Sequence, residues 1–178
     1  MKQLTLKNND TVIIRQAGKT DAKEIIELLN RICGESDFLT FGPGEFTMTI
    51  EQEENFLENI LKQSNALFLA AEDNGKLIGT LTFSGGSRPR IAHTGEMSLC
   101  VLKEYWGNGV GTALIEYLIE WCRQTGIIKK INLRVRTDNA SAIHVYRKLG
   151  FIESGMITRE TQVGGVFYDN LLMGYTID

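Results

Sequence analysis

Residues 105–114 read YWGNGVGTAL, with glycine at every second position from Gly107 to Gly111. Glycine at this density costs backbone entropy, so a compensating role is expected. The residues that follow, VGTALIEYLIEWCRQ (110–124), carry apolar side chains at helical spacing, which predicts that the glycines form the turn before a helix. Unpaired N–H groups at a helix start favour an anion, and glycines let a phosphate approach the backbone. The stretch therefore predicts a phosphate-binding turn.

Two common nucleotide motifs do not fit this turn. The P-loop, GxxxxGK(S/T), needs a lysine that reaches the phosphates, and residues 107–112 contain none. The dinucleotide motif, GxGxxG, needs a third glycine where this sequence has Thr112, and it opens a βαβ unit near the start of a parallel sheet. A tight turn whose glycines serve packing alone stays as the alternative interpretation.

Hydrophobic patterning along the chain predicts seven strands and four helices in one α+β domain spanning residues 1–178. The strands are expected over residues 11–17, 66–73, 76–85, 91–102, 130–136, 151–160 and 164–177. The helices are expected over residues 21–32, 49–63, 110–124 and 137–149. Thr20 and Thr49 are the predicted caps of the first two helices, and Gly126 is the predicted stop of the third.

Composition narrows the class of protein. The chain has 178 residues, 43% hydrophobic and 23% charged, as in an ordinary soluble globular protein. A net charge of −3 argues against nucleic acid as a partner, and no apolar run is long enough for a signal peptide or a membrane span. The three cysteines and two histidines form no metal-binding motif, which indicates reduced thiols and no metal. We therefore expect a cytoplasmic protein.

Two segments resemble the hallmarks of the GNAT family of N-acetyltransferases. LCVLKEYWGNGVGTALIEYLIEW (99–121) is similar to the acetyl-CoA motif (Q/R)xxGx(G/A), with Gly109 and Gly111 in the glycine places and Trp106 where Gln or Arg is usual. LRVRTDNASAIHVYRKLGF (133–151) is similar to the family's NxxAxxxYxxxGF motif. The matching residues there are Asn139, Ala142, Tyr146, Gly150 and Phe151. The resemblance covers nearly the whole chain and implies a GNAT-like fold, a mixed, mostly antiparallel sheet of about seven strands flanked by four helices.

The resemblance implies acetyl-CoA as the cosubstrate. Its pyrophosphate would lie on the backbone amides of the glycine turn, which are those of Gly107, Asn108, Gly109, Val110, Gly111 and Thr112. The strand over 96–101 would splay away from the strand over 130–136, and the pantetheine arm would bond to the freed backbone near Leu99, Cys100 and Val101. Asn139 reads as a helix cap, and the resemblance adds a hydrogen bond to the pantetheine arm.

Acetyl transfer to an amine needs a neutral amine, an oriented carbonyl and a proton for the departing thiolate. Tyr146 matches the family tyrosine near the thioester sulfur, where it would protonate the thiolate; the alternative is a core aromatic. Glu96 lies on the strand beside the thioester and is the candidate general base, acting through water; the alternative is a solvated or structurally paired carboxylate.

The acceptor site is expected between the first two helices and at the last hairpin. The loop over 34–45 and the residue after it combine acidic and aromatic side chains, which suits a cationic amine, although a solvated loop is an equal alternative. These side chains are Glu35, Asp37, Phe38, Phe41, Glu45 and Phe46. GGVFYDNLLMGYTI (164–177) resembles the hairpin of ribosomal-protein N-terminal and diamine acetyltransferases.

That resemblance implies direct attack in a ternary complex by a primary amine, either a small polyamine-like molecule or a protein N-terminus. Members of the family are often dimers, so a homodimer is an expected state. Two functions without catalytic turnover also stay open: a sensor that binds acetyl-CoA or CoA, and an interaction domain.

Overall fold

The computed structural model describes residues 1–6 and 11–178. Its strands are β1 (Lys2–Thr5), β2 (Thr11–Gln16), β3 (Ala66–Asp73), β4 (Lys76–Gly85), β5 (Thr94–Val101), β6 (Lys130–Arg136), β7 (Ile152–Val163) and β8 (Val166–Thr176). Its α-helices are α1 (Ala22–Glu35), α2 (Ile50–Leu61), α3 (Val110–Thr125) and α4 (Ala140–Lys148), and two 3₁₀ turns are η1 (Lys19–Asp21) and η2 (Lys103–Tyr105). Among these helices none is long and apolar enough to cross a membrane.

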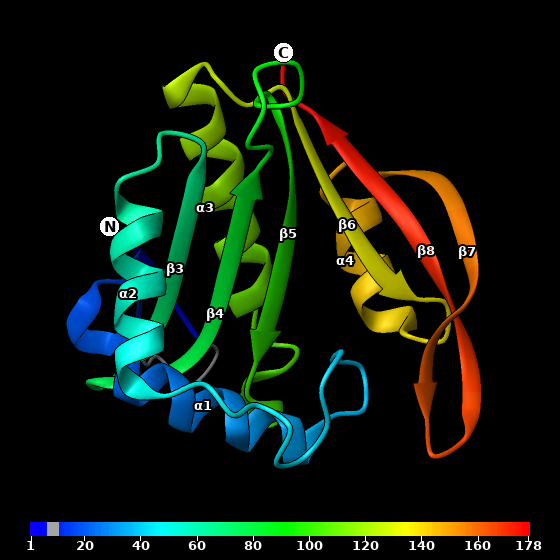
Figure 1. Cartoon of the computed structure of the whole chain (residues 1–178), viewed down its shortest axis with the longest axis horizontal. Helices are drawn as coiled ribbons and strands as arrows, with labels where there is room; N and C mark the ends of the chain where they lie inside the picture. Colours follow the sequence, from blue (N-terminus) through cyan, green and yellow to red (C-terminus); the bar gives the residue numbers. More distant parts are fainter. Residues whose placement is uncertain (7–10) are drawn as a thin grey trace.

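All eight strands form one mixed sheet in the order β1-β2-β3-β4-β5-β6-β8-β7 within the described residues (Figure 1). Every neighbouring pair is antiparallel except β5 and β6, which are parallel. Helices α1 and α2 cover one face of the sheet, and α3 and α4 cover the other (Figure 1). The predicted α+β class and the GNAT-like arrangement are confirmed, with one strand more than expected.

The additional strand is β1, where no strand was predicted. It pairs antiparallel with β2, with Lys2 opposite Ile14. Four residues are too few to show an alternating pattern, so the sequence gives little signal here. Contacts from elsewhere in the chain hold this strand, because the Lys2 Nζ lies 2.8 Å from the Glu116 carboxylate on α3.

Of the predicted caps of the first two helices, one is confirmed. The Thr49 hydroxyl accepts a hydrogen bond from the Gln52 N–H at 3.2 Å, and the Gln52 side chain accepts one from the Thr49 N–H at 2.8 Å. Thr20 was the wrong cap, because it lies inside η1 and α1 begins only at Ala22. The carboxylate of Asp21 makes the local bond instead, accepting from the Gly18 N–H at 2.8 Å.

The core fills the space between the sheet and its helices. Strand β3 is buried along almost its whole length, which explains its continuous apolar run. Helix α3 supplies Leu114, Ile115 and Leu118, all fully buried, and it packs against β4. This helix ends at Gly126, whose φ of 67° is left-handed, as the sequence predicts.

The middle of the sheet is open at one end. Strands β5 and β6 pair only over Thr94–Lys130, Gly95–Ile131 and Glu96–Asn132. Beyond Glu96, β5 stays with β4 and β6 stays with β8, so the two strands diverge (Figure 1). The prediction that the 96–101 segment leaves the 130–136 strand is confirmed, and this gap positions the candidate site.

Candidate active site

A cavity of about 640 Å³ occupies the gap between β5 and β6. It is lined from both strands, the start of α3, helix α4, the loop after α1 and the β7–β8 hairpin. All predicted site residues except Asn108 line it: Glu96, Leu99, Cys100, Val101, Gly107, Gly109, Val110, Gly111, Thr112, Asn139 and Tyr146. The Asn108 side chain instead donates to the Trp106 carbonyl at 3.3 Å. The fold thus brings together residues that are up to 50 positions apart in the chain.

The glycine turn presents free backbone donors. Gly107 and Gly109 have φ values of 73° and 87°, a left-handed conformation that favours glycine. The first hydrogen bond within α3 runs from the Ala113 N–H to the Gly109 carbonyl at 2.9 Å, so the three N–H groups of residues 110–112 have no acceptor within the helix. Among the described residues, apart from the two chain neighbours of each glycine, no atom lies within 4 Å of a Cβ placed at Gly107 or Gly109. This geometry fits a phosphate group.

Trp106, the departure from the family motif, braces this turn. Its indole N–H donates to the Val101 carbonyl at 2.8 Å, which ties the turn to the end of β5. The side chain is 46% exposed and lines the cavity. Tryptophan therefore supplies a donor at the position where Gln or Arg is usual, and that donor is directed at the protein's own backbone.

Alternation along β5 decides which backbone groups face the gap. The Leu102 N–H donates to the Ile78 carbonyl at 2.9 Å, so the backbone of Cys100, two residues earlier, also faces β4. The N–H and C=O groups of Leu99 and Val101 face the gap. The Val101 carbonyl already accepts the hydrogen bond from the Trp106 indole. Cys100 reaches the cavity with its thiol, which lies 3.2 Å from the Thr80 hydroxyl. Burial raises the pKa of this thiol.

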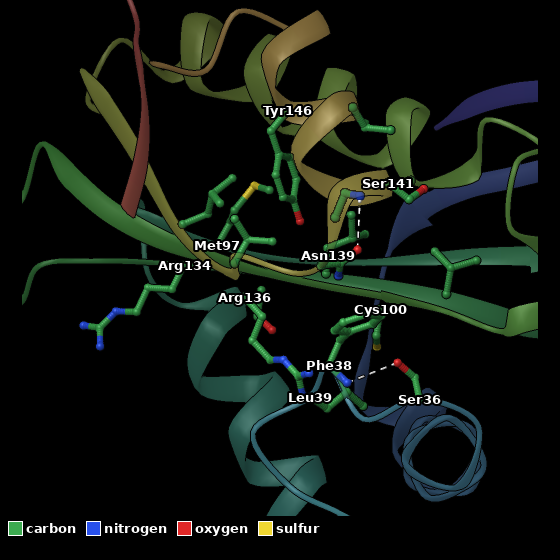
Figure 2. A pocket seen from close by; sticks show the side chains of 18 of the residues that line it. Ser36, Phe38, Leu39, Met97, Cys100, Arg134, Arg136, Asn139, Ser141 and Tyr146 are labelled. Carbon is green, nitrogen blue, oxygen red and sulfur yellow. Dashed lines mark hydrogen bonds between the residues drawn. The ribbon is translucent and has the colours of Figure 1, made fainter. Parts of the chain in front are cut away.

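Helix α4 places Asn139 and Tyr146 at the cavity. Asn139 accepts a hydrogen bond from the Ala142 N–H at 3.2 Å, which confirms its predicted role as a cap. Tyr146 is 8% exposed and packs on Phe151 with ring centroids 5.8 Å apart, so it is also a core aromatic. Its hydroxyl points toward the strands that border the gap (Figure 2). Burial raises the pKa of Tyr146 to about 12, so the phenol is protonated at neutral pH.

The charged side chains of the cavity lie on the face opposite Tyr146. Residues alternate between the faces of a strand, so Glu96 lies opposite Met97, and Arg134 and Arg136 share its face. Figure 2 shows Met97 on the same side of the strands as Tyr146, with Arg136 on the other side. The Glu96 carboxylate is about half exposed and lies 3.2 Å from the Arg134 Nε, so it is structurally paired.

The loop after α1 contributes apolar and hydroxyl side chains rather than the predicted carboxylates. Glu35 accepts a hydrogen bond from the Lys103 N–H at 2.9 Å, and Glu45 accepts one from the Gly42 N–H at 2.8 Å. Both carboxylates therefore bond to backbone, and neither lines the cavity. From this loop the cavity is lined by Ser36, Phe38, Leu39, Thr40 and Phe41.

Sequence reasoning missed Arg136, which anchors that loop. Its guanidinium donates to Asp138 at 2.6 and 3.0 Å and to the Asp37 carbonyl at 2.8 Å. It also stacks 3.6 Å from the centroid of the Tyr168 ring and lies 5.0 Å from that of Phe38. Hydrogen bonding to this arginine holds the pKa of Asp138 below its usual range. The sequence signal was an arginine at the end of a buried strand, where an unpaired charge is costly.

Sequence reasoning also missed Glu160 on β7. It lines the cavity and pairs with Arg134, so that one guanidinium bridges Glu96 and Glu160. The acidic groups that line the cavity thus come from β5 and β7. The last hairpin lines the cavity through Glu160, Thr161 and Asn170, and its role in an acceptor site stays a prediction.

Comparison with known proteins gives the family. Residues 27–151 match the Acetyltransferase (GNAT) family. The L-amino acid N-acetyltransferase AaaT of Escherichia coli K12 is 34% identical over 105 residues, which are 59% of this chain and 65% of that protein. The N-alpha-acetyltransferase of Sulfurisphaera tokodaii is 31% identical over 148 residues, which are 79% of this chain and 80% of that protein.

Among solved structures, an acetyltransferase of the GNAT family from Streptococcus pneumoniae superposes with a TM-score of 0.91 at 36% identity, covering 93% of this chain and 99% of that chain. The family match spans more than half of the chain, and the matched segment includes the glycine turn and Tyr146. The chain therefore belongs to the acetyltransferase (GNAT) family and is an acetyl-CoA-dependent N-acetyltransferase.

Proposed function

We propose that the protein transfers the acetyl group of acetyl-CoA to a primary amine, which attacks directly in a ternary complex. The observation that carries this proposal is the cavity between β5 and β6, which is lined from both faces of the sheet. Free helix amides and Tyr146 border it on one side, and Glu96 and Arg134 border it on the other. Cosubstrate and acceptor can therefore be bound together and meet in the gap.

In this proposal the pyrophosphate lies on the amides of the glycine turn, including that of Asn108. The pantetheine arm extends along the gap-facing backbone of Leu99 and Val101, beside the Cys100 side chain and Asn139. The free N–H groups at the start of α3 and the unpaired edge of β5 support this placement.

The proposed chemistry moves two protons. The acceptor ammonium gives one proton to Glu96 through water, and the neutral nitrogen attacks the thioester carbon. As the carbon–nitrogen bond forms and the carbon–sulfur bond breaks, Tyr146 donates its phenol proton to the thiolate. The nitrogen gives its second proton to water, which restores the phenol proton, and Glu96 returns the first proton to solvent. The raised pKa of Tyr146 keeps the phenol protonated at neutral pH, so its proton is present when the thiolate departs.

We propose two classes of acceptor: a small amine, such as an amino acid or a polyamine, or a protein N-terminus. The test is release of CoA, followed with a thiol reagent, on mixing the protein and acetyl-CoA with L-methionine, spermidine or a peptide that begins with alanine. At least one amine should accelerate release over the amine-free rate. Stabilisation by acetyl-CoA in a thermal melt without turnover of any amine would instead favour a sensor. Absence of that stabilisation as well would favour an interaction domain.

We further propose that the chain works as a single domain, in the cytoplasm and as a homodimer. Four large apolar side chains of the β7–β8 hairpin stay more than half exposed, which supports association through this hairpin. They are Ile152, Met156, Val166 and Phe167. Light scattering of the purified protein should give twice the mass of one chain, and a monomer would refute the dimer alone.

A further inference from the structure

A bulge in β7 turns Glu160 toward the cavity. The pairing of β7 with β8 jumps from Ile157–Asn170 to Thr161–Tyr168, so three residues of β7 stand opposite one residue of β8. Within the bulge Arg159 has a φ of 55°, a left-handed conformation that a non-glycine residue adopts at a cost. Its N–H donates to the Asp169 carboxylate at 2.8 Å, which holds the bulge in place. Strained backbone is thus retained directly before Glu160.

The carboxylate of Glu160 is itself held at a cost. One oxygen pairs with Arg134, but the other, Oε2, is buried without a hydrogen-bond partner among the residues that the structure describes. A buried carboxylate oxygen that lacks a donor destabilises the folded state. An apolar side chain would pack at this position without the cost of burying a carboxylate, so we expect the charge of Glu160 to have a function.

The charge balance of the cavity depends on this residue. Among the described residues that line the cavity, the charged ones are Glu96, Arg134, Arg136 and Glu160. Arg136 is neutralised by Asp138. Arg134 would neutralise Glu96 completely if it had no second partner, but it is shared with Glu160. The acceptor end therefore carries one net negative charge, and Glu160 is its source.

We propose that Glu160 is a specificity-determining residue that makes the acceptor site selective for positively charged amines. This inference rests on the proposed function and names its acceptor as a cationic amine. An ammonium group entering beside the half-exposed Glu96 completes the charge balance of the cluster. Acetylation removes the charge of the reacting nitrogen, so the amide formed there no longer has this attraction, which favours release of the product.

The test compares Glu160→Gln with Glu153→Gln. Glu153 also lies on β7 and also pairs with an arginine, Arg147, but it is outside the cavity. Both variants lose one negative charge, so effects of overall charge are matched. For every amine that the wild type acetylates, E160Q should raise the KM of the amine about tenfold. The KM of acetyl-CoA should stay within about twofold, and E153Q should match the wild type in both values.

Glu160→Asp restores the charge and should recover most of the loss. An amine KM in E160Q equal to that of the wild type overturns the proposal, and so does an amine KM in E160D as high as that in E160Q. Glu160→Met, which removes the charge without burying an amide, replaces E160Q if that variant does not fold.

A binding measurement separates this proposal from the proposed function. If the wild type acetylates none of the three amines, the proposed acceptors are wrong. The role of Glu160 is then tested by measuring the Tm of the CoA-saturated protein with and without spermidine at constant ionic strength. Spermidine should raise the Tm of the wild type and of E153Q, but not that of E160Q. Equal shifts in E160Q and E153Q overturn the inference.

Discussion

Replacing Arg136 with glutamine should both destabilise the fold and loosen the acceptor site. The variant loses the stack on Tyr168 at 3.6 Å, the bond to the Asp37 carbonyl at 2.8 Å and the pair with Asp138. A desolvated cation–π contact and a hydrogen bond from a charged donor together stabilise by several kcal/mol in gross terms. Asp138 is about half exposed and regains water, so we expect a net loss of about 2–3 kcal/mol.

For a chain of this length that loss lowers the Tm by about 4–12 °C, which a thermal melt measures directly. The functional consequence is separate, because Arg136 fixes the loop that carries Phe38, and this loop lines the cavity on the side where we propose that the acceptor binds. We expect the KM of the accepted amine to rise about tenfold in R136Q while the Kd of acetyl-CoA changes less than about twofold.

Arg159→Gln is the control for this experiment. Arg159 is also an arginine over an aromatic ring, 5.5 Å from the centroid of Phe167, but it is exposed. Loss of this contact should lower the free energy of unfolding by less than about 1 kcal/mol and leave the KM of the amine and the Kd of acetyl-CoA unchanged. If R136Q melts within about 2 °C of the wild type, or if its amine KM is unaltered, the argument that Arg136 anchors the loop is refuted.

Four further variants test the site and the core. Tyr146→Phe should lower kcat about a hundredfold with the Kd of acetyl-CoA nearly unchanged, and wild-type turnover in a single-turnover assay would remove Tyr146 from the mechanism. Gly109→Ala forces alanine to a φ of 87° and should cost about 1–2 kcal/mol and abolish the thermal stabilisation by acetyl-CoA. Gly126→Ala, at the other end of α3 with a φ of 67°, should cost a similar amount and keep that stabilisation. Glu53 is 2% exposed, and burial raises its pKa in the folded state. Its ionised carboxylate therefore destabilises the folded state at pH values above the folded-state pKa, and this penalty is absent below the pKa of the unfolded chain. Glu53→Gln should therefore raise the Tm by at least about 2 °C at pH 7.5 and by less at pH 4, and an equal change at both pH values would contradict this reasoning.

The features predicted correctly from sequence are those encoded within short segments. Helix α3 follows from apolar spacing, and the preceding turn follows from glycines that adopt a left-handed backbone. Thr49 and Gln52 form a capping box that four consecutive residues specify. β1 was missed because its four residues show too little alternation, and its ion pair comes from α3.

The features that were missed depend on contacts between distant residues. Glu160 lies in a bulge where β7 gains two residues relative to β8, and no local pattern in the sequence predicts this bulge. Arg136 meets Phe38 and Tyr168, which are 98 and 32 positions away in the chain. The loop carboxylates Glu35 and Glu45 were assigned to the acceptor from their type alone, but nearby N–H groups bind both.

The divergence of β5 and β6 also bears on how the exposed edge of β5 is kept from pairing with a strand of another molecule. An unpaired strand edge ordinarily lies at the rim of a sheet, where it can template the addition of a strand from another molecule. Here such an edge, at Leu99 and Val101, lies in the interior of the sheet, and β6, α4 and the α1–α2 loop enclose it. A second folded chain cannot reach it, whereas a slender extended molecule can. Protection of this inner edge and access for a ligand are therefore provided by the same topology.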